Sequence, residues 1–171
     1  MANTYVAIQT ITVGATAVAT MEFTSIPQTY TDLVIKISGK PDSGGTGAIA
    51  IQFNSTTSTY TTKRLYGDGS GAASDSSATT NYLKVGFVGN STGSNNFGNA
   101  EIYISDYTSA NQKSVSTDSV SEGNSTTQYM TIMAGLWNGT GAITNIKVNG
   151  DNGVYNFAQY TTATLYGINK S

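Results

Sequence analysis

The segment Thr31–Gly39 has the clearest structural pattern in the chain, because apolar and polar side chains alternate along it. Leu33, Ile35 and Ile37 fall on one face of an extended strand, and mostly polar residues fall on the other. A period of two is typical of a β-strand that is buried on one side. The same period returns along the whole chain, and no helical period competes with it. The sequence therefore predicts an all-β protein.

The alternating segments are short and are separated by turn-forming residues, which is the spacing of an antiparallel β-sandwich with about ten strands. Besides Thr31–Gly39, the segments expected to form strands are Thr4–Val13, Ala17–Thr24, Ala48–Phe53, Thr59–Tyr66, Tyr82–Val88, Asn99–Ser105, Lys113–Val120, Gln128–Trp137, Ala142–Val148, Val154–Tyr160 and Thr162–Ile168. A chain of 171 residues corresponds to one domain. We therefore expect a single β-sandwich domain over residues 1–171.

Local signals also predict how some strands are connected. The first two segments are separated by a short turn and are expected to form a hairpin, with a bulge near Gln9 or Thr10 where the alternation slips. Gly67–Thr80 consists of small and polar residues, which predicts a long loop. Asn138–Gly141 has the composition of a hairpin turn.

The predicted core is made of inward-facing apolar residues from these strands. They are Leu33, Ile35, Ile37, Ile49, Ile51, Phe53, Leu83, Val85, Phe87, Ile102, Ile104, Met130, Ile132 and Leu136.

The segment Gln128–Trp137 differs from the others because both of its faces carry large side chains. Since its even-numbered apolar residues are assigned to the core, Tyr129, Met133 and Trp137 are expected to point outward. A sandwich buries only one face of each sheet in its own core, and Tyr, Trp and Met are enriched at protein interfaces. These three residues and Tyr166 are therefore the candidate subunit or ligand contacts, and they predict a homo-oligomer.

The charge pattern excludes some classes of partner. The chain has eight Lys and Arg residues against ten Asp and Glu residues, a net charge of −2, and the cations are scattered along the sequence. A surface that neutralises nucleic-acid phosphates needs clustered cations, so no nucleic-acid partner is expected. No apolar run approaches the roughly 20 residues of a membrane-spanning helix. No membrane partner is expected either.

The residues that usually perform catalysis are scarce. The chain has neither Cys nor His, which removes thiolate nucleophiles, the commonest general base and most zinc sites. The turns at Asp68 and Asp151 lack the spacing of a calcium loop, and no pair of carboxylates has a spacing specific for a glycosidase. We expect no enzymatic activity, catalytic residue, cofactor or metal. Trp137 and the tyrosines could stack on sugar rings, although Tyr is also an ordinary strand residue.

Five stretches resemble a known group of proteins. They are Phe23–Ser38 (FTSIPQTYTDLVIKIS), Leu65–Ser70 (LYGDGS), Phe97–Tyr107 (FGNAEIYISDY), Ala134–Thr144 (AGLWNGTGAIT) and Thr162–Ile168 (TATLYGI). The residues of these stretches and their order along the chain resemble those of small structural proteins of tailed-bacteriophage virions. The resemblance spans nearly the whole chain.

The resemblance implies a jelly-roll-like β-sandwich in the virion, without catalytic residues that map onto this chain. It implies a capsid decoration or head-fibre protein on the particle exterior, in contact with other virion proteins such as the major capsid protein. The alternative is a tail- or fibre-borne module that binds a receptor or a glycan of the host surface. Because virion decorations and fibres are often threefold, the expected oligomer is a trimer.

Overall fold

The computed structural model describes residues 4–43, 45–79, 81–90, 96–123, 128–151 and 153–169, and these residues form strands and loops without any helix. The strands are β1 (Tyr5–Thr12), β2 (Thr20–Phe23), β3 (Asp32–Gly39), β4 (Thr46–Phe53), β5 (Tyr60–Gly67), β6 (Ala72–Thr79), β7 (Leu83–Asn90), β8 (Gly98–Ile104), β9 (Lys113–Ser121), β10 (Tyr129–Trp137), β11 (Ile146–Gly150) and β12 (Thr162–Ile168). The predicted all-β class is confirmed.

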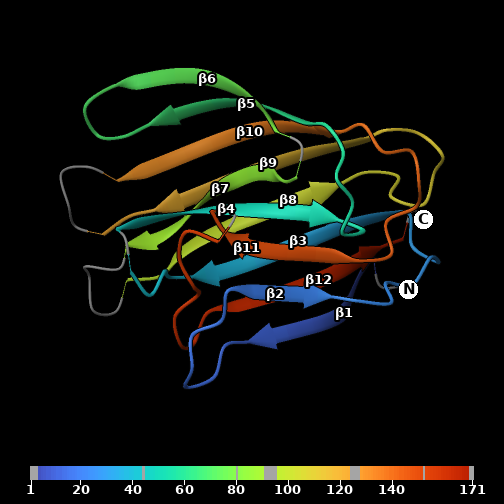
Figure 1. Ribbon diagram of the computed structural model, residues 1–171, viewed down its shortest axis with the longest axis horizontal. Helices are drawn as coiled ribbons and strands as arrows, with labels where there is room; N and C mark the ends of the chain where they lie inside the picture. The colour runs from blue at the N-terminus through green and yellow to red at the C-terminus, as the bar shows by residue number, and fades with distance from the viewer. Residues whose placement is uncertain are drawn as a thin grey trace.

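The strands form two sheets that lie face to face (Figure 1). The larger sheet has eight strands in the order β1-β12-β3-β8-β9-β10-β5-β6, and the smaller has four in the order β2-β11-β4-β7. All strand pairs within the sheets are antiparallel. The structure is therefore the antiparallel β-sandwich that the alternating segments predict.

Four antiparallel pairs are nested in the sequence: β1 with β12, β2 with β11, β3 with β8, and β4 with β7. The chain crosses between the two sheets at each step of this nested frame except from β4 to β7, which are neighbours in the smaller sheet. Two pairs of strands are inserted into it, β5 and β6 after β4, and β9 and β10 after β8. The inserted strands all extend the larger sheet beyond β8, and β7 of the smaller sheet packs against β8, β9 and β10.

The core lies between the sheets and contains most of the residues predicted for it. Leu33, Ile35, Ile37, Ile49, Ile51, Phe53, Leu83, Val85, Ile102 and Ile104 are all buried. Phe87 is only partly buried. Period-two alternation therefore identified the inner face correctly in β3, β4 and β8, and in β7 as far as Val85. Beyond the register shift between Lys84 and Gly86, Val88 is buried instead of Phe87.

The assignment for β10 is wrong because its two faces are reversed. Met130 and Ile132 are exposed, whereas Met133 and Trp137 are buried at 4% and 2% exposure. Trp137 packs against the ring of Phe53, with 5.4 Å between centroids. Alternation shows that β10 has two faces, but with large groups on both it does not show which face meets the second sheet.

Leu136, the third β10 residue predicted for the core, is likewise at the surface. The inner face of β10 carries Gly135 instead, and a Cβ there would lie 2.7 Å from a methyl group of Leu83. β7 therefore packs closely against the face of β10 that carries the odd-numbered residues, and the face with the even-numbered residues points away from the smaller sheet.

Two of the predicted connections are also wrong. β1 does not form a hairpin with β2, because β1 pairs with β12 and β2 pairs with β11. Asn138–Gly141 does not close a hairpin, because β10 and β11 belong to different sheets. The expected bulge in β1 is confirmed as a register shift between Ala7 and Gln9. Strand pairing over long sequence distances decided these connections, and local turn composition does not report it.

Two segments have a different secondary structure from the one predicted. Most of Gly67–Thr80 is not loop, because Ala72–Thr79 forms β6 and pairs with β5 along its whole length. Only a short turn remains, in which the backbone N–H groups of Ser70 and Gly71 donate to Asp68. Val154–Tyr160 makes only isolated bridges, at Tyr155 and Phe157.

Candidate functional site

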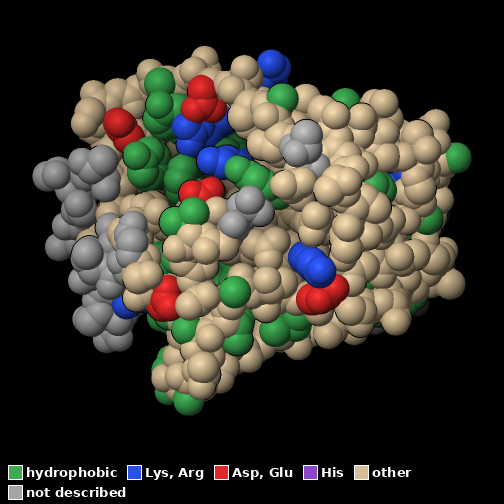
Figure 2. Space-filling model, in the orientation of Figure 1, with side chains coloured by type: hydrophobic (Ala, Val, Ile, Leu, Met, Phe, Trp, Pro, Cys, Tyr) green, Lys and Arg blue, Asp and Glu red, His purple; other side chains and the backbone are tan. Residues whose placement is uncertain are grey.

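A pocket of about 280 Å³ with a mixed polar and apolar lining lies where the inserted strands extend past the smaller sheet. Its walls come from the β5–β6 hairpin on one side and from β4, β7 and the turn after β11 on the other. Figure 2 shows a hollow near the upper left of the molecule where basic and acidic side chains gather among hydrophobic ones. The pocket therefore lies between the inserted strands β5 and β6 of the larger sheet and the strands β4 and β7 of the smaller sheet.

The first wall carries an ion pair between Arg64 on β5 and Asp75 on β6. These residues are opposite one another in the antiparallel register, so both side chains point to the same face of the hairpin. Nε of Arg64 donates to one carboxylate oxygen over 3.1 Å, and Nη2 donates to the other. The guanidinium also lies over the ring of Tyr66, 4.2 Å from its centroid. This packing and the two-point contact fix the direction of both charged groups.

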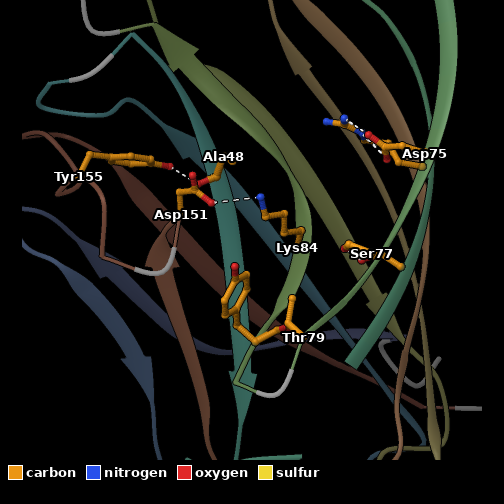
Figure 3. Close-up of polar contacts among 10 residues, drawn as sticks. Ala48, Asp75, Ser77, Thr79, Lys84, Asp151 and Tyr155 are labelled. Atoms are coloured by element: carbon orange, nitrogen blue, oxygen red, sulfur yellow. Dashed lines mark hydrogen bonds and ion pairs between the residues drawn. The ribbon is translucent and has the colours of Figure 1, made fainter. Parts of the chain in front are cut away.

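The second wall carries a looser ion pair between Lys84 on β7 and Asp151, with Nζ 3.5 Å from Oδ1 (Figure 3). Behind it, the hydroxyl of Tyr155 donates to the backbone oxygen of Ala48, and burial raises the pKa of this hydroxyl. Asp75 and Ser77 lie across the opening from Lys84 and Asp151 (Figure 3). Each basic group in the pocket thus has a carboxylate partner, and the four charges sum to zero.

Hydroxyl groups and apolar side chains complete the lining. The hydroxyls of Thr62 and Ser77 are 2.9 Å apart on facing positions of β5 and β6. Met133 also lines the pocket, as does the partly buried ring of Phe87. The pocket therefore offers hydrogen-bond donors, acceptors and apolar surface side by side.

The backbone of β7 is held against the larger sheet by a buried polar contact. The N–H of Phe87 donates to the hydroxyl of Ser119 over 3.0 Å, and that hydroxyl lies 2.6 Å from the hydroxyl of Thr131. Gly86 has φ +140°, and a Cβ there would lie 2.4 Å from the Ser119 hydroxyl oxygen. The glycine permits the close approach that places Phe87 at the pocket.

A second feature is an exposed apolar area on the outer face of the larger sheet, which we call the outer apolar face. Its side chains come from three adjacent strands, and all are exposed. They are Leu65 on β5, Val120 on β9, and Met130, Ile132 and Leu136 on β10.

The strand register places these residues next to one another. Ile132 is opposite Leu65, and Met130 is opposite Val120. Large aliphatic groups in adjacent rows form a continuous patch, which marks a binding surface more often than scattered apolar residues do.

The flanks of the outer apolar face carry opposite charges. Asp118 on β9 pairs with Ile132 in register on one side, and Lys63 on β5 pairs with Ala134 on the other. Both charged residues are exposed. One edge of the face is therefore acidic and the other basic.

The four predicted contact residues do not form one surface. Met133 and Trp137 are buried between the sheets, and Tyr129 lies on the same inner face of β10, stacked on Phe87 at 4.6 Å between ring centroids. Tyr166 lies partly exposed on β12, with its ring 6.1 Å from that of Tyr5. The expectation that Tyr129, Met133 and Trp137 point outward is wrong because the two faces of β10 are reversed.

Sequence reasoning did not single out the residues of the pocket. Asp75 falls in Gly67–Thr80, which the sequence predicts as a loop, so local patterns predict neither its pairing with Arg64 nor its position near Lys84. Thr62 and Arg64 are two residues apart on a predicted strand, so the sequence does indicate that they share one face of β5. The junction itself depends on how the sheets are stacked.

In the part of the chain that the structure describes, no three His, Cys, Asp or Glu residues gather closely enough to hold a metal ion. Within the same residues, no helix is long and apolar enough to cross a membrane. Asp151, the partner of Lys84, lies in a turn as the sequence predicts, and its backbone φ is 39°.

Comparison with known proteins adds no identification. No protein-family model matches the chain. No curated protein matches it significantly.

Proposed function

We propose that this chain is a structural component of a bacteriophage virion, located on the capsid exterior as a decoration or head-fibre protein and assembled as a homo-oligomer. The proposal assigns it no catalytic activity. Its expected partners are further copies of the chain and other virion proteins, with the major capsid protein as the attachment point. The sequence resemblance suggests this role, and the outer apolar face supports it.

The proposal depends on the exposure of Met130 and Ile132, whose side chains are 64% and 61% exposed. Both lie on β10, which pairs with a strand on each side in the eight-stranded sheet. Exposed aliphatic groups at adjacent positions are costly for a protein that remains alone in water. A protein that acts as a building block covers them on assembly. A structural role therefore explains why apolar side chains are exposed at these positions.

The occupant that best fits the outer apolar face is a second copy of the same chain. Its acidic edge at Asp118 and basic edge at Lys63 are complementary to each other. Three copies around a threefold axis that runs parallel to β10, with this face turned toward the axis, bring the basic edge of one chain against the acidic edge of the next. Interfaces between identical subunits commonly combine an apolar centre with such a charged rim. We expect three copies in the assembly.

The strand order supports assigning the jelly-roll form of the sandwich. Without the inserted strands, the sheets read β1-β12-β3-β8 and β2-β11-β4-β7, built from the four nested pairs. Eight strands in two sheets with nested antiparallel pairing are the arrangement of a jelly roll, a fold used in viral capsid proteins. A fold is compatible with many functions, so this supports the class of protein and not a particular role.

The test is to locate the chain on the particle. Mass spectrometry of purified virions of the encoding phage should detect the chain at many copies per particle. Gold-labelled antibody raised against the purified protein should bind the head surface. Absence of the chain from purified virions would contradict the proposal. Labelling confined to the tail would favour the tail-borne alternative.

A further inference from the structure

We propose that the pocket between the β5–β6 hairpin and β7 binds one neutral saccharide unit. This site is distinct from the outer apolar face and does not depend on the structural role proposed above. Arg64 and Asp75 supply paired donors and acceptors on one wall, and Lys84 and Asp151 supply them on the other. A sugar ring presents hydroxyl groups around its edge, and each can donate and accept at once.

The balance of charge selects a neutral ligand. The Arg64 guanidinium makes two hydrogen bonds to Asp75, so an anion would have to compete with a carboxylate that is already in place. Lys84 Nζ lies 3.5 Å from Asp151 Oδ1, longer than an ordinary hydrogen bond, so ammonium hydrogens and carboxylate lone pairs are left for a ligand hydroxyl that approaches both groups from the pocket. Hydroxyl groups satisfy both partners without adding net charge to the pocket.

The remaining lining residues suit the other hydroxyl groups of a sugar and the C–H groups of its ring. The hydroxyls of Thr62 and Ser77 extend the polar wall, while Phe87 and the 73%-exposed Val154 offer apolar surface for the C–H groups of the ring. The volume of about 280 Å³ is near the lower end of the range for ligand pockets, about 300–1,000 Å³. The pocket therefore fits one ring and not a long oligosaccharide, and its affinity should be millimolar in order of magnitude.

The test is saturation-transfer difference NMR with glucose, galactose, mannose and N-acetylglucosamine, and with N-acetylneuraminic acid as a charged comparator. At least one neutral sugar should give a signal from its ring protons, and N-acetylneuraminic acid should give a weaker one. Lys84→Met and Asp75→Asn should each weaken binding about tenfold, because each removes part of one ion pair. Ser77→Trp should abolish binding by filling the pocket while leaving both ion pairs in place.

A matched control exists on the far side of the sheet, where Lys36 and Glu101 form an exposed ion pair at 2.9 Å. Lys36→Met and Glu101→Gln change the same charges outside the pocket and should leave sugar binding unchanged. Melting temperatures of all variants identify any that fail to fold, and light scattering shows whether assembly is altered. Pocket variants should leave assembly intact, so a failure of either proposal can be told from a failure of the other.

Three results would overturn the saccharide proposal. They are the absence of a signal from all four neutral sugars, a signal that persists in folded Lys84→Met and Ser77→Trp, and a response to N-acetylneuraminic acid alone. The last result would show an anion site and not a neutral one.

Discussion

Ile132 on β10 lies directly opposite Leu65 on β5, and the two side chains are 61% and 57% exposed. They form the centre of the outer apolar face. Directly paired aliphatic groups on neighbouring strands stabilise a sheet, but their remaining surface faces water unless another molecule covers it. This pair is the most direct place to test assembly.

We predict that Ile132→Lys converts the oligomer into a monomer. A lysine at the centre of the apolar contact would have to bury an ammonium group, which is costly. Because it lies opposite Asp118, it would also take up the carboxylate that the proposed interface pairs with Lys63 of the next copy. Size exclusion coupled to light scattering should show the wild-type chain as an oligomer, with a trimer expected, and the variant at the mass of one chain.

The matched control for assembly is Tyr160→Lys, which introduces the same charge at a 68%-exposed position outside the outer apolar face. It should leave the oligomer unchanged. A wild-type chain that is monomeric at micromolar concentration would overturn the assembly proposal, whatever its place in the virion.

Met133 and Met130 offer a test of which face of β10 is buried. Met133→Ala should lower the free energy of unfolding by about 2–5 kcal/mol, because it leaves a cavity between the sheets. Met130→Ala, at a 64%-exposed position of the same strand, should change it by at most about 0.5 kcal/mol. Urea unfolding at low protein concentration, where assembly contributes little, measures both. Equal losses would mean that the faces are not arranged as described.

Gly86 should resist substitution because of its backbone conformation and its close neighbour. Ala at this position must adopt φ +140° and place its Cβ 2.4 Å from the hydroxyl oxygen of Ser119. Strain and overpacking together should cost about 2–5 kcal/mol. Gly14→Ala is the control, since a Cβ there meets nothing within 4 Å and should change stability by about 0.5 kcal/mol or less. A Gly86→Ala protein as stable as wild type would rule out the close contact of β7 with β9.

Tyr103 should titrate at unusually high pH. Burial and the nearby Asp32 carboxylate, which accepts a hydrogen bond from the Tyr103 hydroxyl over 2.8 Å, raise the pKa of this tyrosine to about 12. Subtracting the phenolate absorbance titration of Tyr103→Phe from that of wild type should leave one step with a midpoint near 12. A step near the ordinary value of 10.0 would contradict the contact.

The same shift predicts how stability depends on pH. The protonated hydroxyl is favoured in the folded state, so its contribution is fully present below the unfolded pKa of about 10. As the pH rises from there toward about 12, the unfolded state loses the proton first and the contribution is lost. Tyr103→Phe should lack this part of the alkaline loss of stability, as measured by urea unfolding at a series of pH values.

The sequence by itself determined the class of fold and most of its strands. Period-two alternation is a local property, so it identified β3, β4, β7 and β8 and placed Leu33, Ile35 and Ile102 on the inner side. It also located the irregularity of β1, because a bulge shifts the alternation within one strand. These features depend on residues close together in the chain.

The tertiary structure alone decided which strands pair and which face of β10 is inside. The pairing of β1 with β12 joins the two ends of the described chain, and no turn signal reports a contact over that distance. Trp137 and Met130 lie on opposite faces of one strand, and the stacking of the smaller sheet onto one face of β10 buries the first and leaves the second exposed. The pocket has the same origin: Arg64 and Lys84 come from different sheets, so only the overhang of the inserted strands brings them to one site.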